Sequence, residues 1–270
     1  MISFKQIFDF YLRSSIHVAL SVYALVRMTH FMFNITTDQP MANFAFLGTI
    51  VGYNFVKYNA LARVKKGGMR NELKLIALLS FVSLLGVGYY FFQLALITQI
   101  VSVALLVLTL LYTVPFFPNR KNARNWAGVK IYIVALCWVG VTLVLPLLNA
   151  DTSLGVDFYL KCIQRFILVF VLILIFEILD MANDDPHLKT VPQQIGVKRT
   201  KITGLLLLLP FYFLEFLKNT FIEEQLLVNG VLVVTLSLFL AFANEKQTKY
   251  YTSFWVESIP IFWWLMVVFF

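Results

Sequence analysis

The sequence predicts an all-α membrane protein in which nine transmembrane helices form one bundle. Three observations support this fold class: the composition, the length of the apolar stretches and the placement of the basic residues. Of the 270 residues, 60% are hydrophobic and only 13% are charged, and the mean hydropathy is +0.81. Soluble domains carry about 25% charged residues, so a water-soluble protein is excluded. No long linker, low-complexity tract or internal repeat is present, and we expect residues 1–270 to form a single domain.

Nine apolar stretches remain when the chain is divided at its charge clusters. Each is close to the ~17–25 residues that a helix needs to cross a ~30 Å hydrocarbon layer. The predicted spans are residues 14–33, 42–61, 74–92, 94–116, 129–149, 159–180, 202–218, 225–243 and 253–270. The third and fourth spans belong to one apolar block from Leu73 to Phe117, which is too long for one crossing. We divide it at Tyr89–Gln93, because aromatic and amide side chains suit the membrane interface.

The basic residues predict the orientation of the bundle. Of the 22 Lys and Arg residues, 17 lie in the N-terminal segment and in the loops after the second, fourth, sixth and eighth spans. The opposite loops hold only Lys218. The positive-inside rule therefore places the N-terminus and the long loops in the cytoplasm, and Phe270 outside the cytoplasmic (inner) membrane. The pI of about 9.4 follows from this topology and gives no reason to expect a nucleic-acid partner.

Two further segments have a simple interpretation. Ile2–Leu12 precedes the first span and is amphipathic, which fits a helix in the membrane interface and not a signal peptide. The two cysteines, Cys137 and Cys162, fall within apolar stretches. We expect them to be small packing residues and not a disulfide.

Charged residues inside the spans require partners, because an unpaired charge costs about 2.5–3.5 kcal/mol at mid-membrane. We expect Lys161 to snorkel to the outer surface. Arg27 and Arg165 lie deeper, and the acids that could pair with them are Glu215 and Glu257. The alternative for both arginines is a lipid headgroup or a partner chain.

Single histidines also occur in the first span, at His17 and His30. Neither has a second ligand at metal-binding spacing, so we expect each to hydrogen-bond a neighbouring helix.

The end of the sixth span holds four acids within nine residues, from Glu177 to Asp185. Glu177, Asp180 and Asp184 have i, i+3, i+7 spacing, which places three carboxylates on one helical face. Pro186 disfavours helix at the residue before it, so these acids lie where the helix dipole opposes further negative charge. One interpretation is a solvated helix end balanced by nearby basic residues. These are Lys189, Lys198, Arg199 and Lys201. The other is a Mg²⁺ site for a phosphorylated substrate, because Mg²⁺ prefers oxygen ligands.

This segment resembles the second aspartate-rich region of the UbiA family of intramembrane prenyltransferases. In that family a D-x-x-x-D helix end precedes a K-T-x-P-x-x-x-G-x-K loop, and here Asp180-x-x-x-Asp184 precedes the loop Lys189–Thr200. Matches to the family's fourth and fifth helices are Leu111-Tyr112-x-x-Pro115, Arg120-Lys121, Gly128 and Trp138. The region from Asp180 to Thr200 carries the specific part of the resemblance.

The resemblance implies a nine-helix bundle around a central cavity that is open to lipid, with a cytoplasmic cap. Family members transfer an isoprenyl group from its diphosphate to an acceptor, with Mg²⁺ held between two aspartate-rich helix ends. On this basis Asp180 and Asp184 would bind Mg²⁺ and act in catalysis. The substrate-binding residues would be Asn54, Lys57, Tyr112, Lys121, Lys189 and Lys198. Neutralising the negative charge of the departing diphosphate would lower the barrier to forming an allylic cation from the isoprenyl group.

The first aspartate-rich motif of that family, N-D-x-x-D-x-x-x-D, has lost its acids in this chain. Aligned on Asn54, the three aspartates become Phe55, Tyr58 and Ala62. No Asp or Glu occurs anywhere from Met41 to Asn71, so a shifted alignment does not restore the motif. Half of the expected metal site is therefore missing.

A lysine, Lys57, has appeared in the same helix, one turn after Asn54 and on its face. We expect the Lys57 ammonium to pair with Asp180 or Asp184 and to supply the positive charge that a metal supplies in the enzymes. The alternative is that Lys57 snorkels to the lipid headgroups.

Two functions of different classes follow. The first is a prenyltransferase with an altered metal site, using Asp180 and Asp184 for Mg²⁺ and Lys121, Lys189 or Lys198 for the diphosphate of an isoprenoid. The second is a non-catalytic family member, a pseudoenzyme that binds a membrane lipid or isoprenoid or serves as an accessory subunit of a larger membrane complex. A transporter ranks third, because no paired Gly/Pro-interrupted helices occur in two halves.

The predicted orientation can be tested by labelling single cysteines in intact cells, in a background with Cys137→Ala and Cys162→Ala. The substitutions expected to be shielded from an impermeant thiol reagent are Lys66→Cys, Asn122→Cys, Gln193→Cys and Lys246→Cys. Asp38→Cys and Ser153→Cys should react, because they fall in the loops with few basic residues. The opposite labelling pattern would reverse the topology.

Overall fold

The computed structural model describes residues 3–36, 38–64, 71–114, 128–181, 188–219 and 222–270. Every regular element within these ranges is helical. In chain order they are α1 Phe4–Arg13, α2 Ile16–Met32, α3 Gln39–Val64, α4 Asn71–Phe91, α5 Leu96–Thr113, α6 Val129–Val139, η3 Gly140–Val144, α7 Leu145–Asn149, α8 Val156–Asp180, α9 Val191–Ile195, α10 Val197–Phe213, η5 Leu214–Leu217, α11 Glu223–Phe242, η6 Tyr251–Val256 and α12 Ile259–Phe269. The all-α prediction is confirmed for these residues.

Each predicted span coincides with a helix or with a continuous run of helices. Seven of the described helices are long and apolar enough to cross a membrane, namely α4, α5, α6–α7, α8, α10–η5, α11 and η6–α12. The predicted first span corresponds to α2, an apolar helix of 17 residues, and the predicted second span to α3. The division of the long apolar block is confirmed, because α4 ends at Phe91 and α5 begins at Leu96.

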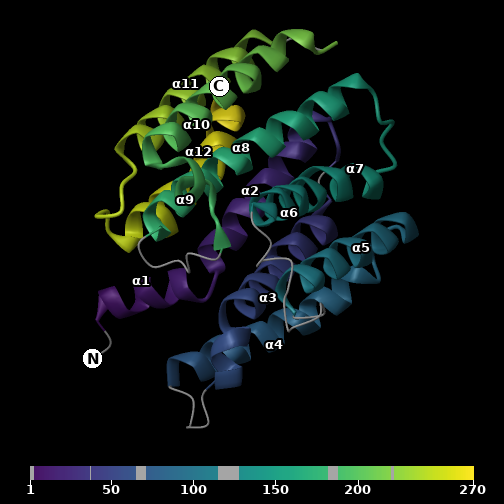
Figure 1. Ribbon diagram of the computed structural model, residues 1–270. Coiled ribbons are helices and arrows are strands. Elements are labelled where there is room, and N and C mark those ends of the chain that lie inside the picture. Colours follow the sequence, from purple (N-terminus) through teal and green to yellow (C-terminus); the bar gives the residue numbers. More distant parts are fainter. Residues whose placement is uncertain (1–2, 37, 65–70, 115–127, 182–187, 220–221) are drawn as a thin grey trace.

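Helices α2 and α8 form the centre of the bundle. In Figure 1, α3, α4 and α5 lie on one side of α2, and α10, α11 and α12 lie on the other side with α8. The largest group of buried apolar residues joins α2, α8, α10, α11 and α12, with Leu25, Leu168, Phe211 and Leu236 fully enclosed. The outward faces of α4 and α5 expose leucine, valine and phenylalanine side chains. Such faces suit contact with lipid.

Two glycines allow helices to approach closely. A Cβ atom on Gly204 of α10 would lie 2.5 Å from Leu240 of α11, and one on Gly140 of η3 would lie 2.7 Å from Leu105 of α5. Small residues at such contacts let helices pack by van der Waals attraction where lipid gives no hydrophobic driving force.

The amphipathic N-terminal segment forms α1, as expected. Its apolar residues Phe4 and Ile7 are exposed, while Phe8 packs edge-on against Phe254 of η6. Asp9 pairs with Lys249 at 2.9 Å and accepts a hydrogen bond from Tyr250. These hydrogen bonds lower the pKa of Asp9, so the contact between α1 and the start of η6 persists to acidic pH.

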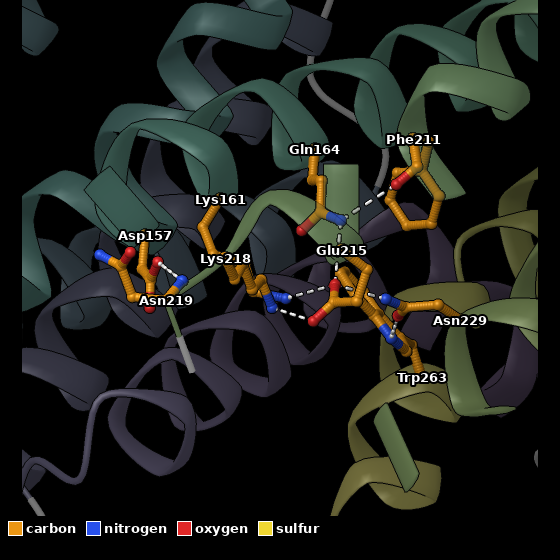
Figure 2. A network of polar contacts seen from close by, with 9 residues as sticks. All are labelled: Asp157, Lys161, Gln164, Phe211, Glu215, Lys218, Asn219, Asn229 and Trp263. Atoms are coloured by element: carbon orange, nitrogen blue, oxygen red, sulfur yellow. Dashed lines mark hydrogen bonds and ion pairs between the residues drawn. The ribbon is translucent and has the colours of Figure 1, made fainter. Parts of the chain in front are cut away.

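A buried carboxylate, Glu215, joins four elements of the bundle (Figure 2). Lys161 Nζ of α8 lies 3.4 Å from Glu215 Oε2, and Lys218 pairs with the other carboxylate oxygen. The amides of Gln164 and Asn229 donate to Glu215 Oε2 at 3.0 and 2.8 Å. The prediction that Lys161 snorkels is wrong, because its side chain is only 5% exposed. The Coulomb attraction between this ammonium and the carboxylate is strong because the interior of the bundle has a low dielectric constant.

Arg165 is also fully enclosed, but it does not pair with an acid among the described residues. Its Nη1 donates to Thr142 Oγ1 at 3.0 Å and to the Leu25 carbonyl at 3.4 Å. Its guanidinium carbon lies 5.5 Å from the ring centroid of Trp263, a distance typical of a cation–π contact. The predicted pairing with Glu215 or Glu257 is therefore wrong for Arg165.

Among the described residues, the structure gives His17 the hydrogen-bond partner that the sequence predicted, but it gives none to His30 or to Arg27 Nη1. His17 bonds a neighbouring element as predicted, through the Phe254 carbonyl. Within the described ranges, neither ring nitrogen of His30 has a hydrogen-bond partner, and Arg27 Nη1 has none either. No described carboxylate forms an ion pair with Arg27. A lipid headgroup or partner chain remains the prediction for this arginine.

Replacing the buried acid by Glu215→Ala should destabilise the bundle by about 3–5 kcal/mol, because it leaves Lys161 and Lys218 buried without their counter-charge. The measurement is reversible unfolding in mixed micelles followed by circular dichroism. The matched control is Asp9→Ala, which removes a solvent-exposed pair with Lys249 and should cost less than about 1 kcal/mol. Equal losses in the two variants would show that the Glu215 network does not hold the helices together.

Candidate functional site

The acidic helix end predicted from the sequence lies at the C-terminus of α8. Asp180, its last residue, is exposed, whereas Glu177 one turn earlier is only 3% exposed. Glu177 Oε2 accepts a hydrogen bond of 3.0 Å from the backbone nitrogen of Val191, the first residue of α9. Glu177 therefore satisfies a helix N-terminus, which is a structural role that the i, i+3 spacing did not indicate. Asp184 lies outside the described residues.

The loop after α8 is organised by its own capping interactions. Thr190 and Gln193 form a capping box at the start of α9, with the Thr190 nitrogen donating to Gln193 Oε1 at 2.9 Å. Gly196 has φ +82°, a conformation that favours glycine, and α10 follows directly. Lys189 and Lys198 are exposed on either side of α9. Of the predicted diphosphate ligands, Lys121 lies outside the described residues.

Asn54 is buried and anchors α3 to two other helices. Its side-chain nitrogen donates to the Ser14 carbonyl at 3.0 Å and to Ser80 Oγ of α4 at 2.9 Å. Its side-chain oxygen accepts a hydrogen bond of 2.8 Å from Ser15 Oγ. Ser15 has a positive φ of 62° at the corner between α1 and α2. The side-chain nitrogen and oxygen of Asn54 thus both support that corner, and the nitrogen also joins α3 to α4.

The residues that follow Asn54 contact the same corner. Tyr58 donates to the Arg13 carbonyl at 2.8 Å, and Lys57 Nζ donates to that carbonyl at 3.4 Å. Among the described residues Lys57 forms no ion pair with Asp180 or any other acid. The predicted pairing with Asp180 is wrong, because Lys57 is drawn to the exposed carbonyl at the end of α1. The alternative pairing with Asp184 lies outside the described residues.

Glu257 is an acid that sequence reasoning did not connect with Lys57. The Glu257 carboxylate, directly after η6, lies within electrostatic range of Lys57 and Tyr53 of α3 and of Tyr11 of α1. We call Tyr11, Tyr53, Lys57 and Glu257 the polar cluster, in which the Lys57 side chain is exposed. Burial and the nearby Glu257 carboxylate raise the pKa of Tyr11. Glu257 is the only acid after Glu245, and an ionisable residue in a span is a functional-site signal by itself.

Hydrogen bonds hold the surroundings of the cluster in place. His17 lies between the Tyr11 hydroxyl, 2.6 Å from Nδ1, and the Phe254 carbonyl, 2.9 Å from Nε2. If Nε2 carries the proton and donates to Phe254, Nδ1 accepts from Tyr11. On the other side, Trp138 Nε1 donates to the Tyr53 hydroxyl at 2.7 Å. Tyr112, a predicted substrate-binding residue, is buried within electrostatic range of Tyr53.

The residues do not fit a two-sided Mg²⁺ site. Within the described part of the chain, no three His, Cys, Asp or Glu side chains lie close enough to share a metal ion. Glu177 caps α9, and α3 presents Asn54 and Lys57 where a second set of acids would be needed. A fixed ammonium repels a divalent cation.

Comparison with known proteins identifies the fold. The sequence matches no family model and no curated protein. A structure of digeranylgeranylglyceryl phosphate synthase is similar with a TM-score of 0.59 and 12% identity, covering 98% of this chain and 96% of that chain. A UbiA homologue from Archaeoglobus fulgidus bound to Cd²⁺ has a TM-score of 0.59 and 10% identity, covering 94% and 97%. Another structure of a UbiA homologue from that organism has a TM-score of 0.59 and 12% identity, covering 95% and 97%.

At these identities the likeness shows the fold alone. The chain has the UbiA-like fold, as the sequence resemblance implied. Together with the seven apolar helices, this makes it an integral membrane protein.

The structural role of Asn54 can be measured. Asn54→Leu should lower the free energy of unfolding by about 1–3 kcal/mol, because it leaves the buried Ser14 carbonyl and Ser15 hydroxyl without partners. Asn43→Leu is the matched control, since Asn43 lies on the same helix and accepts an exposed hydrogen bond from Gln39. If unfolding in mixed micelles shows similar small effects for both variants, Asn54 does not anchor the corner.

Proposed function

We propose that this chain is a membrane protein of UbiA-like fold that binds an isoprenoid or a related lipid in its bundle, without catalysing metal-dependent prenyl transfer. In this proposal residues 1–270 form one domain with nine crossings around a lipid-accessible interior. The N-terminus and polar cap are cytoplasmic and Phe270 is outside, as the placement of the basic residues favours. Such a pseudoenzyme can also serve as an accessory subunit of a larger membrane complex.

The proposal rests on what the polar residues of α3 bind. Asn54, Lys57 and Tyr58 all contact the corner between α1 and α2. By the resemblance, the same stretch of an active enzyme would carry acids that hold metal on a diphosphate. Here the stretch has no acid, contributes a cation and stabilises the fold.

The ligand class is supported by the similar structures. One of them is described as digeranylgeranylglyceryl phosphate synthase in membranes, a name that denotes an isoprenoid lipid product. The bundle of this chain keeps the overall fold over nearly its full length. An apolar isoprenyl chain would gain about 0.8 kcal/mol for each CH₂ group that it buries away from water.

A second candidate is Mg²⁺-dependent prenyl transfer, which one observation favours. Asp180 is exposed at the end of α8, beside a capped loop that presents Lys189 and Lys198. In this candidate Asp180 and Asp184 would hold Mg²⁺, and Lys121, Lys189 and Lys198 would bind the diphosphate. The metal would neutralise the leaving group.

One experiment separates the two candidates. Native mass spectrometry of the purified chain should detect a bound isoprenoid or lipid, and incubation with radiolabelled geranylgeranyl diphosphate, Mg²⁺ and membrane lipid extract should give no transfer product. The double variant Asp180→Asn, Asp184→Asn should keep the bound ligand, because the proposal gives those acids no role in binding. Mg²⁺-dependent product that this variant abolishes would establish the second candidate. A wild-type protein that carries no lipid and forms no product would overturn both.

A further inference from the structure

We propose that a polar pocket at the end of α2 that lies away from α1 binds a primary ammonium group. Free ethanolamine and the head group of phosphatidylethanolamine share this chemistry. The pocket has a volume of about 490 Å³ and is lined by the segment after α2, the start of α3 and the end of α7. It is a second site, so the inference does not rest on the proposed function.

The polar side chains of the pocket favour a singly charged cation. Those that line it are Asn34, Thr36, Asp38, Asn149 and Thr152. Asp38 is the only charged residue in this lining, and no described cation forms an ion pair with it. A divalent metal ion would need several oxygen ligands with more negative charge. One carboxylate matches one ammonium.

The Asp38 carboxylate is held in position by hydrogen bonds to two other elements. Its Oδ1 accepts a hydrogen bond of 3.0 Å from the Met41 nitrogen in the first turn of α3, and its Oδ2 accepts one from the Asn149 amide of α7. Asn149 is itself fixed, because its side-chain oxygen accepts from the Ala95 nitrogen at 2.8 Å. A carboxylate can accept about four hydrogen bonds, so capacity for a ligand remains.

Two helices end at the pocket with the same capping motif. After α2, the Ile35 nitrogen donates to the His30 carbonyl at 2.8 Å. After α7, which ends the continuous run Val129–Asn149, the Thr152 nitrogen donates to the Leu147 carbonyl at 3.1 Å. Each turn contains a residue of positive φ, as in the Schellman motif. The negative ends of two helix dipoles therefore meet at the pocket, where they attract a cation.

The remaining polar groups favour an ammonium that carries hydrogens. The Asn34 amide oxygen and the hydroxyl oxygens of Thr36 and Thr152 can each accept a hydrogen bond. Among the described residues these three side chains have no other hydrogen-bond partner. A primary ammonium offers three donors, whereas the trimethylammonium group of choline offers none. The pocket should therefore select ethanolamine over choline.

The test uses two pairs of probes with the full chain in detergent micelles. One pair is phosphatidylethanolamine and phosphatidylcholine with identical acyl chains, measured by native mass spectrometry. The other is free ethanolamine and choline, measured by calorimetry. In at least one pair the wild-type chain should bind the primary amine about tenfold more tightly, which is the worth of about one charge-assisted hydrogen bond. The pair that shows the preference identifies the source of the amine as lipid or soluble.

Two variants assign the preference to the pocket. Asp38→Asn removes the charge but keeps a side-chain oxygen for the Met41 nitrogen, and it should weaken binding of the primary amine about tenfold. Asn34→Gly removes an acceptor and keeps the turn, because glycine is favoured there, and it should weaken binding about threefold. The matched control is Glu245→Gln, which changes an exposed acid between α11 and η6 and should leave affinity unchanged.

Equal affinities within both pairs would overturn the inference, and so would a preference that persists in Asp38→Asn. An equal loss in Glu245→Gln would also overturn it, because the effect would then come from overall charge. If Asp38→Asn does not fold, Asn34→Gly decides, and an unchanged affinity in that variant refutes the site. Isoprenoid binding is measured separately and stands or falls by its own experiment.

Discussion

The position of α8 depends on a carboxylate at each end, and much of the remaining structure depends on α8. Near its first turns, Lys161 and Gln164 bind Glu215, which also binds Asn229 of α11. Asn229 accepts a hydrogen bond from Trp263 of α12, so one acid connects four helical elements. At the other end Glu177 caps α9. Polar groups inside an apolar bundle must be satisfied by the protein itself, so these contacts determine which helices are neighbours.

The same constraint connects the fold to the candidate site. At the corner between α1 and α2, the carbonyl groups of Arg13 and Ser14 accept hydrogen bonds from side chains of α3. The donors are Asn54, Lys57 and Tyr58. A stretch that would carry metal ligands in an enzyme of this fold therefore stabilises the bundle. Glu257, from the other end of the sequence, interacts electrostatically with Lys57.

Helix positions could be predicted closely, and charge partners could not. The apolar stretches predicted α4, α5 and α11 to within three residues, because the length of a crossing is imposed by the membrane. The predictions for Lys161, Arg165 and Lys57 were wrong for another reason. Helical periodicity shows which face a residue occupies but not which helix packs against that face. In the structure Lys161 binds a carboxylate, Arg165 donates to a hydroxyl and Lys57 donates to a carbonyl, and none of these partners is the one that the sequence predicted.

By itself the sequence determined that the chain is helical and membrane-embedded, that four of its acids gather at the end of the sixth predicted span, and that α3 has none. Those properties depend on composition and on spacing within one helix, which are local. Only the tertiary structure decided that Glu177 is committed to α9 and that Glu257 comes within electrostatic range of Lys57. Glu257 and Lys57 lie 200 residues apart in the chain. Such contacts arise from the packing of whole helices, because a buried charge is satisfied by whichever polar atom the completed bundle brings near it.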